Sequence, residues 1–414
     1  MRIAFFIDGT FIPERDGAST RFARLPSAIS RSGLSVRVFH AFRGWSCLER
    51  IAKEPYLTYF FNPNNYYNNQ NLLARLINHE SINIIQMNDL ETIQKIGIPL
   101  AHATGVKLVY EAHYHSSTLA RQLGLPKAKI KTIESLERKI ADNVDHIITF
   151  SDPDRQRWVG LSRVFPDRVS IVPFGFDCAN SRTDFGLAGW PSVVFIGNGY
   201  FEPNRRAVMR IVSEIWPSLR SRITDSSCLI IGDMPAKLRT ACLKVGIKVA
   251  GEVPDPSELI RSCAIGIAPV SEGSGVRVKL LQYLSAGLPV VATSAAAEGL
   301  TFPAIVIEDR LSFYANVIQD LLADSQRVER LVQESQYLLM QKYTWKDIAE
   351  TAKETYRRVT NRQTRKRCDP GPRFDDLPMW LDEALRSGRF AGYDDRADIA
   401  YTYGVAHDGT ISLY

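Results

Sequence analysis

Long hydrophobic runs are absent from this sequence: no apolar stretch approaches the roughly 20 residues that a membrane-spanning helix needs. The first residues, MRIAFFIDGT, do not form a signal peptide either, because their apolar stretch is only five residues long and stops at Asp8. With 45% hydrophobic and 23% charged residues, the composition is that of a soluble globular protein. We therefore expect a cytoplasmic protein, with peripheral contact to a membrane as an open alternative.

Cysteine pairs are absent too. The six cysteines are scattered, and no two of them have the spacing of a metal site or of a redox motif. Reduced structural thiols are therefore expected. The acidic stretch SDPD at 151–154 is typical of a helix N-cap rather than of a metal motif, so we expect no metal cofactor. The cysteines are Cys47, Cys178, Cys228, Cys242, Cys263 and Cys368.

Charge of one sign is only mildly in excess. The chain has 51 Lys+Arg against 45 Asp+Glu, a formal net charge of +6. This balance suits anionic ligands or an acidic membrane surface but does not indicate nucleic acid as a partner. Its visible source is RRVTNRQTRKR at 357–367, a run that is typical of a solvated tail segment. A membrane-docking patch is the alternative for that run.

The chain does have the length for two domains, 414 residues, and a pattern that occurs twice. Short β-rich runs alternate with helical patterns, from RIAFFID to VSIVPF in the first half and from SVVFIG to AIVIED in the second. Such alternation predicts parallel sheets with helices on both faces. We therefore predict an α/β fold of two Rossmann-like, doubly wound parallel-sheet domains that face a cleft, where such folds bind their ligands.

Domain boundaries follow from a change in composition. The stretch DCANSRTDFGLAGWP has the Gly, Pro, Ser and Asn content of a linker. Helical spacing continues to about residue 360, and beyond it Pro, Gly and mixed charge replace the regular pattern, although MWLDEALRSG is compatible with one helix. The predicted parts are an N-terminal domain at 1–178, a C-terminal domain at 188–344, a crossing helix at 345–360 and a tail of unassigned structure at 361–414.

Aromatic and asparagine residues are concentrated in YLTYFFNPNNYYNNQN at 56–71. Aromatic faces with amide groups beside them are suited to holding a sugar ring. The simpler interpretation, which we favour, is a strand followed by an asparagine-rich turn and the start of a helix.

The densest stretch of the sequence is SEGSGVRVKLLQYLSAGLPVVAT at 271–293. It has no histidine or cysteine and one acid, Glu272, so it does not contain a nucleophile with its base. The preceding IGIAPV predicts a buried strand, SEGSG a loop, and VRVKLLQYLSAG a helix that ends at Gly287.

The residue types in this loop and helix start are those of a phosphate site. Gly273 and Gly275 let backbone amides approach a ligand closely, because no Cβ intervenes. The helix start adds free N–H groups and the positive end of a dipole. Arg277 and Lys279 are unfavourable at that end unless an anion receives them. The sequence therefore predicts a phosphate-binding site, with a plain strand-loop-helix unit as the alternative.

In order and composition this stretch resembles the C-terminal signature of family 4 glycosyltransferases with the GT-B fold, and the resemblance extends over residues 1 to about 360. MRIAFFIDGTFIPERDGAS resembles the first strand and glycine-rich loop of that family, with Gly17 at the turn. LVYEAHYHSS resembles the strand that carries a histidine into the cleft, and VVFIGNGYFEPNRRAV, with Gly197, the opening of the nucleotide-binding domain.

The resemblance implies transfer of a sugar from a nucleotide-diphosphate sugar to a hydroxyl of a glycan, lipid-linked or other acceptor, with retention of the anomeric configuration and in the synthesis of a glycoconjugate such as a cell-surface polysaccharide or glycolipid. His113, or else His115, would hydrogen-bond the donor sugar or the acceptor. The implied catalytic residues are His113, Arg277 and Lys279, and the implied donor-binding residues are Gly17, Gly197, Glu272, Gly273, Ser274, Gly275 and Gln282.

The sequence departs from the family pattern at two glutamate positions. Ser274 and Gln282 stand where many members carry the glutamates that contact the donor sugar and the ribose. A glutamine has one acceptor oxygen where a carboxylate has two, so ribose binding would be altered or weakened. Glu272 would replace the missing sugar contact. The usual Arg and Lys after the first strand of the second domain are also not at their usual spacing, and Arg277 and Lys279 would take over that role, with Arg205 and Arg206 as lesser candidates.

Glycosyl transfer is the leading hypothesis, and Ser274 and Gln282 are the only support for an alternative from another class, a non-catalytic GT-B protein that binds a nucleotide sugar or a glycan. A third interpretation is a Rossmann oxidoreductase or an epimerase on the same fold. The oxidoreductase is disfavoured because no predicted strand is followed by a dinucleotide fingerprint. The sugar, the base and the acceptor depend on loops whose sequences carry no general signal.

Overall fold

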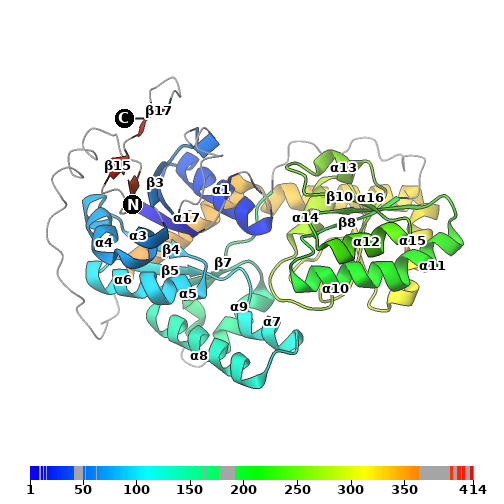
Figure 1. Cartoon of the computed structure of the whole chain (residues 1–414), viewed down its shortest axis with the longest axis horizontal. Helices are drawn as coiled ribbons and strands as arrows, with labels where there is room; N and C mark the ends of the chain where they lie inside the picture. Colours follow the sequence, from blue (N-terminus) through cyan, green and yellow to red (C-terminus); the bar gives the residue numbers. More distant parts are fainter. Residues whose placement is uncertain are drawn as a thin grey trace.

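The structure is a computed structural model of the whole chain, and it shows two domains side by side (Figure 1). The residues that it describes are 1–8, 11–12, 14, 16–41, 50–51, 53–61, 63–161, 164–176 and 192–362, together with the strands at 392–394, 399–401, 403–405 and 411–413. The predicted linker at 177–191 and the predicted tail helix MWLDEALRSG lie outside these described residues.

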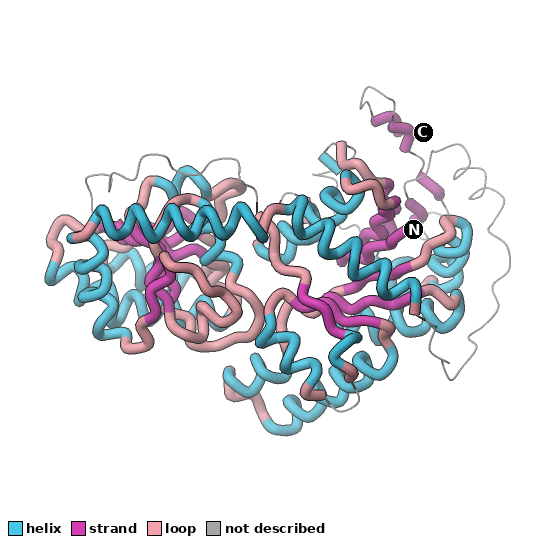
Figure 2. The backbone as a smooth tube through the Cα atoms, turned by 180° about the vertical axis from the view of Figure 1, so that it is seen from behind, coloured by secondary structure: helices cyan, strands magenta, loops and turns pink. Residues whose placement is uncertain are grey.

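The first domain is built on a seven-stranded sheet with the order β3-β2-β1-β4-β5-β6-β7, in which every pairing is parallel. Helices cover both faces of the sheet (Figure 2). In chain order the elements are β1 (Arg2–Asp8), α1 (Gly17–Arg31), β2 (Ser35–Ala41), β3 (Leu57–Phe61), α3 (Pro63–Asn68), α4 (Gln70–His79), β4 (Ile84–Met87), α5 (Leu90–Thr92), a π-helical turn (Ile93–Gly97), α6 (Ile98–Thr104), β5 (Lys107–Glu111), α7 (Ser116–Gln122), α8 (Lys127–Asn143), β6 (His146–Thr149), α9 (Asp152–Val159), a 3-10 turn (Pro166–Arg168) and β7 (Val169–Ile171).

The second domain repeats this plan with a six-stranded parallel sheet of order β10-β9-β8-β11-β12-β13. Its elements are β8 (Ser192–Ile196), α10 (Glu202–Arg210), a π-helical turn (Ile211–Ile215), α11 (Trp216–Arg222), β9 (Ser227–Ile231), α12 (Ala236–Lys244), β10 (Lys248–Gly251), α13 (Ser257–Arg261), β11 (Ile265–Ala268), α14 (Val278–Ser285), β12 (Val290–Ala292), β13 (Ile305–Ile307), a 3-10 turn (Leu311–Phe313), α15 (Tyr314–Ala323) and α16 (Ser325–Lys342). The prediction of two Rossmann-like, doubly wound domains is confirmed.

Strand β1 shows why the apolar runs form central strands. Ile3 and Phe5 pack into one hydrophobic core, whereas Ala4 and Phe6 pack into a second core on the opposite face of the sheet. A strand that is buried on both faces needs apolar residues at every position, which explains the run RIAFFID. The predicted runs RIAFFID, VSIVPF, SVVFIG and AIVIED each contain a strand of the structure, namely β1, β7, β8 and β13.

Shorter predictions are confirmed as well. The aromatic stretch at 56–71 forms strand β3 and then helices α3 and α4, which is the simpler of its two interpretations. Ser151 is the N-cap of α9 and accepts a hydrogen bond from the Asp154 amide. Gly287 follows the end of α14 with a φ of +81°, a left-handed conformation that suits glycine.

The chain crosses between the domains twice, and the two crossings are bonded together. The Phe176 amide donates to the Tyr343 carbonyl at 2.8 Å, and Phe176 and Thr344 form a parallel bridge. Helix α17 (Trp345–Asn361) then runs back onto the first domain, where it packs on α1 (Figure 1). The Tyr356 hydroxyl donates to the Gln86 side chain at 2.6 Å. Helix α17 is therefore bonded to the first domain, although it follows the second domain in the sequence.

Beyond α17 the described strands form two antiparallel pairs. β14 (Gly392–Asp394) pairs with β15 (Ile399–Tyr401), and β16 (Tyr403–Val405) pairs with β17 (Ile411–Leu413). The pair with β14 lies beside the edge strand β3 of the first sheet.

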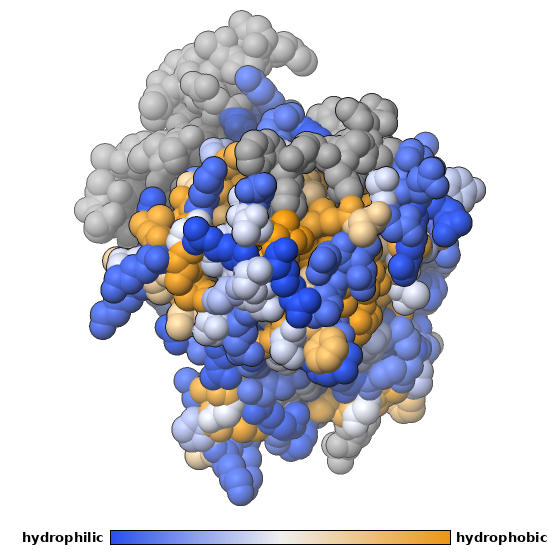
Figure 3. All heavy atoms as spheres, turned by 90° about the vertical axis from the view of Figure 1, so that its right-hand side faces the viewer, coloured by the Kyte–Doolittle hydropathy of each residue, from blue (hydrophilic) through white to orange (hydrophobic). Residues whose placement is uncertain are grey.

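The surface and the thiols fit the composition. At the end of the second domain, hydrophilic residues cover most of the face and hydrophobic ones form patches between them (Figure 3). Cys228, Cys242 and Cys263 are buried free thiols, as expected from the sequence. No helix within the described ranges is both long enough and apolar enough to span a membrane.

Candidate active site at the seam between the domains

The second sheet places several of the predicted residues at its topological switch point. In the second sheet β8 and β11 are neighbours whose crossover connections leave in opposite directions, and a crevice at their carboxyl ends is where doubly wound folds bind ligands. Gly197 follows β8, and the loop with Glu272, Ser274 and Gly275 follows β11. The fold therefore brings these two segments, which are far apart in the sequence, to the same edge of the sheet.

Arg277 folds back over this loop. It is the N-cap of α14, and its guanidinium donates to the carbonyls of Glu272 at 3.1 Å, Ser274 at 3.0 Å and Gly275 at 3.2 Å. Gly273 makes this possible, since a Cβ on it would lie 1.9 Å from Arg277 Nη2. Burial lowers the pKa of the guanidinium, while Asp154 and Glu298 oppose the shift. Arg277 thus fixes the shape of the loop, and its buried Nε has no hydrogen-bond partner within the described ranges.

Lys279 joins the two switch-point segments. Its Nζ donates to the Asn204 side chain at 2.8 Å and lies 4.1 Å from the centre of the Phe195 ring. Burial, with the positive charge of Arg277 adding to it, moves its pKa well below the ordinary value of lysine. Within the described residues neither Lys279 nor Arg277 forms an ion pair. Asn204 is itself held close to Gly197, on which a Cβ would lie 2.8 Å from Asn204 Cγ.

The loop after β11 is bound to the first domain, and we call this contact of residues 273–275 with His115, Gln122 and Asp154 the seam. Ser274 Oγ accepts from the His115 amide at 2.7 Å and donates to the His115 carbonyl at 3.0 Å. The Gly273 amide donates to Gln122 Oε1 at 2.5 Å, and the Gly275 amide donates to Asp154 Oδ1 at 3.1 Å. The loop amides that we predicted to bind phosphate therefore donate to oxygens of the first domain in this structure.

Two glycines permit this close approach of the domains. A Cβ on Gly275 would lie 2.3 Å from the backbone carbonyl oxygen of His113, and the φ of Gly275 is +84°. A Cβ on Gly17, the first residue of α1, would lie 2.9 Å from Val278 Cγ2 at the start of α14. Gly17 is thus a packing position in the seam. Across the same seam Arg157 pairs with Glu298.

His113 lies at the carboxyl end of β5 with its ring between two aromatic rings. The ring centres of Phe22 and Phe150 are 5.4 and 5.1 Å from it. Its Nε2 lies 3.4 Å from Glu111 Oε2. Glu111 is buried together with Arg21, whose Nη2 is 2.7 Å from Glu111 Oε1. Burial alone would raise the pKa of Glu111, but Arg21 and then His113 hold it at about 2.

Sequence reasoning missed Arg21 and Glu111. A signal was present, since Glu111 is the one acid in the strand KLVYE and stands two residues before His113. An acid in a buried strand needs a partner for its charge. The partner itself, 90 positions away, has no mark in the sequence.

His115 contributes to the seam through its backbone rather than its ring. The ring is buried, and its Nδ1 is 3.1 Å from the Thr118 hydroxyl and 3.6 Å from Glu137 Oε1. Burial, with Arg157 and Arg121 adding to it, lowers the pKa of His115 to about 4. The neutral ring is therefore a packing group under Ser274, and His113 is the histidine with an accessible edge.

Glu272 is held on the second domain by arginines of α10. Arg210 donates to both of its carboxylate oxygens, at 2.6 and 3.1 Å, and Arg206 approaches to 3.4 Å. Burial opposes ionisation of Glu272, but the two guanidinium groups outweigh it and lower the pKa. Arg205 pairs with Glu202 instead. Gln282, on α14, is half-buried, and its side chain makes no hydrogen bond to the described residues.

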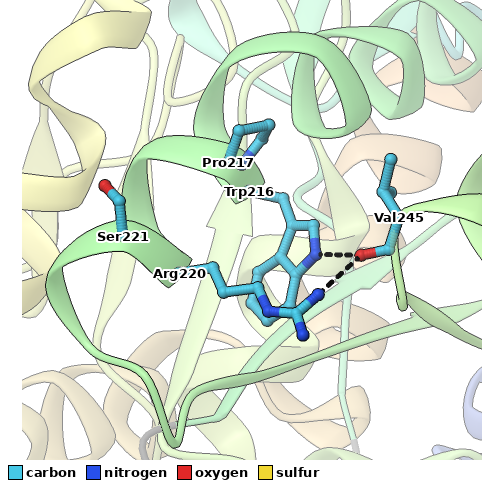
Figure 4. A pocket seen from close by; sticks show the side chains of 5 residues that line it. All are labelled: Trp216, Pro217, Arg220, Ser221 and Val245. Carbon is cyan, nitrogen blue, oxygen red and sulfur yellow. Dashed lines mark hydrogen bonds between the residues drawn. The ribbon is translucent and has the colours of Figure 1, made fainter.

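A hollow of about 400 Å³ lies elsewhere on the second domain. Trp216 and Arg220 of α11 line it with Val245, whose carbonyl accepts from Trp216 Nε1 at 2.8 Å and from Arg220 Nη1 at 3.5 Å (Figure 4). Pro217 and Ser221 complete the lining. It contains none of the predicted site residues, so the candidate site is the seam.

Two family profiles match the chain, one for each domain. The family described as Glycosyl transferases group 1 matches residues 190–333, which include the segments after β8 and β11. The family described as Glycosyltransferase Family 4 matches residues 15–180. Together the matches cover most of both domains. None of the curated proteins compared with the chain matches it.

Solved structures share the fold over nearly the whole chain. HepE from Anabaena, in complex with UDP and glucose, is 15% identical with a TM-score of 0.66, and the match covers 86% of this chain and 100% of that one. A glycosyltransferase from Rickettsia africae is 14% identical with a TM-score of 0.67, covering 87% and 99%. Sucrose-phosphate synthase from Thermosynechococcus elongatus is 16% identical with a TM-score of 0.66, covering 87% and 99%. Identities this low establish the shared fold.

Proposed function

Because the chain belongs to the group 1, family 4 glycosyltransferases with the GT-B fold, we propose that it moves a hexosyl group from a nucleotide-diphosphate sugar to a hydroxyl acceptor with retention of configuration. We place this reaction in the synthesis of a cell-surface polysaccharide, glycolipid or other glycoconjugate. The acceptor is a glycan, a lipid-linked sugar or another hydroxyl compound, and a lipid-linked one would bring the protein to a membrane surface.

The observation that carries the proposal is the pair of buried cations at the switch point. Lys279 and Arg277 lie at the start of α14, and within the described residues no carboxylate is in ion-pair distance of either. Burying a charge without a partner is costly, so the site gains stability when an anion enters. Cleavage of the anomeric C–O bond leaves negative charge on the diphosphate, and the fixed positive charges of Lys279 and of Arg277, which holds the loop, stabilise the transition state by their proximity.

Retention follows from the proposed direction of attack. The acceptor hydroxyl attacks the anomeric carbon on the face from which the diphosphate leaves. The new C–O bond forms as the old one breaks, and the proton of the hydroxyl passes to the departing phosphate oxygen. This route needs no protein nucleophile. It also assigns the stabilisation of the diphosphate to Lys279 and Arg277, so the proposal includes no metal cofactor.

UDP-sugars are the donors to be tried first, because HepE, which shares the fold, has been solved with UDP and with UDP-glucose. In this structure the Gly273 and Gly275 amides are engaged by Gln122 and Asp154. Donor entry therefore includes the exchange of those protein oxygens for phosphate oxygens. His113, on the opposite side of the seam, faces the sugar.

The test is transfer and hydrolysis with purified protein. UDP release from UDP-glucose and related UDP-hexoses, in the presence and absence of chelator, is measured beside binding by calorimetry. The proposal expects slow release of UDP and free sugar without an acceptor, the same rate with chelator, and loss of release in Lys279→Met. Binding without any release supports the non-catalytic alternative instead. The anomeric configuration of the product, read by NMR, tests retention.

A further inference from the structure

The carboxylate of Glu111 has two oxygens with separate partners. Oε1 accepts from Arg21 Nε at 2.9 Å and from Arg21 Nη2 at 2.7 Å, whereas Oε2 lies 3.4 Å from His113 Nε2. We propose that Glu111 is a positioning residue: it fixes the proton of His113 on Nε2 and so leaves Nδ1 as a hydrogen-bond acceptor for a sugar hydroxyl. This inference rests on the proposed function and specifies which atom of His113 contacts the sugar.

Charge determines the direction of the hydrogen bond. The pKa of Glu111 is held at about 2, by Arg21 first and by His113 next, against the effect of burial. The carboxyl group is therefore ionised at any physiological pH and only accepts hydrogen bonds. A neutral imidazole has one N–H, and the bond to Oε2 requires that it be on Nε2. Nδ1 then carries the lone pair.

Packing keeps the ring in this orientation. His113 packs against Phe22 and Phe150, whose rings are tilted to it by 32° and 40°, and its side chain is 13% exposed. Turning the ring over would break the contact with Oε2 and place a carbon next to the carboxylate. Nδ1 makes no hydrogen bond to the described residues. Nδ1 of His113 is thus left to accept a hydrogen bond at the seam.

Arg21 makes the arrangement rigid. It is fully buried, and its Nη1 donates to the Pro173 carbonyl at 2.6 Å while Nη2 also donates to Val172 at 3.2 Å. Its guanidinium lies 4.8 Å from the centre of the Phe150 ring. Arg21 neutralises Glu111 and anchors it to the segment through which the chain leaves the first domain. Arg21 therefore has the structural role, and Oε2 of Glu111 has the orienting role.

The proposed consequence is selectivity for a hydroxyl group. A ring nitrogen with a lone pair accepts from an O–H and gives no bond to a fluorine, hydrogen or methyl ether at the same place. A site built around one buried acceptor rejects analogues that lack the donor, because the acceptor is then left without a partner. If Nδ1 carried the proton instead, the same position would accept a fluoro analogue more readily.

The first test reads the tautomer directly and needs no substrate. Full-length protein with ¹⁵N-labelled histidine is studied by long-range ¹H–¹⁵N NMR near neutral pH, and the His113 signals are assigned by their loss in His113→Asn. The expected result is the Nε2–H tautomer. In Glu111→Asp, which keeps the charge next to Arg21 but shortens the reach, we expect a mixture of tautomers. A ring protonated on Nδ1 alone, or on both nitrogens, in the wild type overturns the proposal.

Glu137→Gln is the matched control. Glu137 is an equally buried carboxylate, 3.6 Å from the Nδ1 of His115 in the same segment. Its replacement is expected to shift signals of His115 and to leave the His113 tautomer unchanged. A change in His113 in this variant as well would mean that the tautomer reports general loosening, and the assignment to Glu111 would fail.

The second test is kinetic and uses the donor that supports turnover. Glu111→Asp is expected to lower kcat by about tenfold, the scale of one charge-assisted hydrogen bond, with KM for the donor changed much less. A higher KM for the donor with an unchanged kcat contradicts the orienting role. If no donor supports turnover, the proposed function fails while the tautomer measurement still decides the role of Glu111.

Discussion

The backbone amide of Gly275 donates a hydrogen bond to Asp154 Oδ1 at 3.1 Å, across 121 positions of the sequence and from one domain to the other. The neighbouring amide of Gly273 donates to Gln122 Oε1. Both acceptors are oxygens of the kind that a phosphate would present to these N–H groups. First-domain side chains therefore compete with the donor for the same loop, and the strength of this competition can be measured.

Gln122→Ala is expected to tighten the binding of UDP. Gln122 is exposed at the end of α7, so its removal frees the Gly273 amide without disturbing a core. A typical net hydrogen bond of about 1 kcal/mol corresponds to about a fivefold lower Kd. Calorimetric titration measures it. Gln156→Ala, an exposed glutamine on α9 outside the seam, is the control and should bind UDP like the wild type. Equal or weaker binding in Gln122→Ala would show that the Gly273 amide does not serve the phosphate.

Gly275→Ala is expected to open the seam. The added Cβ would lie 2.3 Å from the His113 carbonyl, which is backbone and cannot move aside as a side chain would, so the domains must separate. Small-angle scattering should show a larger radius of gyration, and turnover should fall. Gly124→Ala carries a similar φ, +73°, but has nothing within 4 Å of its Cβ. It should cost about 1 kcal/mol of stability and leave shape and turnover intact. An unchanged scattering curve for Gly275→Ala would contradict the closed seam.

The stability of the ligand-free protein should rise with pH more steeply than that of Lys279→Met. Burial first, and Arg277 second, lower the pKa of Lys279 well below 10.5. The folded protein then binds fewer protons than the unfolded chain between the two pKa values, so the free energy of unfolding increases with pH in that window. Below the folded-state pKa the full penalty of the buried charge is present. Methionine has the length but no proton to release.

Urea unfolding at about pH 7 and about pH 9.5 checks this difference. At the lower pH the wild type should have a smaller free energy of unfolding than Lys279→Met. At the higher pH the difference between the two free energies should be smaller. UDP added at the lower pH should stabilise the wild type and have little effect on the variant. A gap that is constant with pH would mean that Lys279 is not buried as a cation. Arg277→Ala is a poorer probe of charge, because it also removes three hydrogen bonds to the loop.

Gln282→Glu is expected to strengthen, or at least retain, the binding of the nucleotide. Gln282 makes no side-chain hydrogen bond to the described residues, so its replacement disturbs no contact of the fold. A carboxylate offers a second acceptor oxygen to ribose hydroxyls, with a gain of about 1 kcal/mol. The negative charge of the new carboxylate is repelled by the diphosphate and attracted by Arg277 and Lys279. Titration of both proteins with UDP measures the balance, and a much weaker variant would remove Gln282 from the ribose site.

Local patterns were sufficient to predict the architecture. RIAFFID and SVVFIG have apolar centres because central parallel strands are covered on both faces, and this property can be read from each run by itself. The N-cap Ser151 and Gly287 after α14 could likewise be predicted from the few residues around each helix end. The order of the strands and the position of β11 beside β8 agree with the repeated pattern, because a doubly wound sheet has few alternatives.

The candidate site was less accessible to sequence reasoning, because its contacts join distant segments. Gly273, Gly275 and Lys279 could be singled out from the loop and the helix start. The sequence could not show that Arg277 turns back onto the loop carbonyls, because its position is equally compatible with a side chain that faces a ligand. Gln122 lies on a helix with no unusual composition, and Asp154 stood out only as part of an acidic helix start, so only the closed arrangement of the domains reveals their contacts.

The bonded crossings at Phe176 and Tyr343 determine how the two halves of the molecule can move. A single connecting segment would act as a loose tether and allow sliding, twisting and separation. Two parallel segments held together form a strip, which resists shear and stretch but bends about its own axis. Any opening of the seam would therefore be a rotation about these paired segments, and closing it would bring Gly275 back to the same carbonyl of His113.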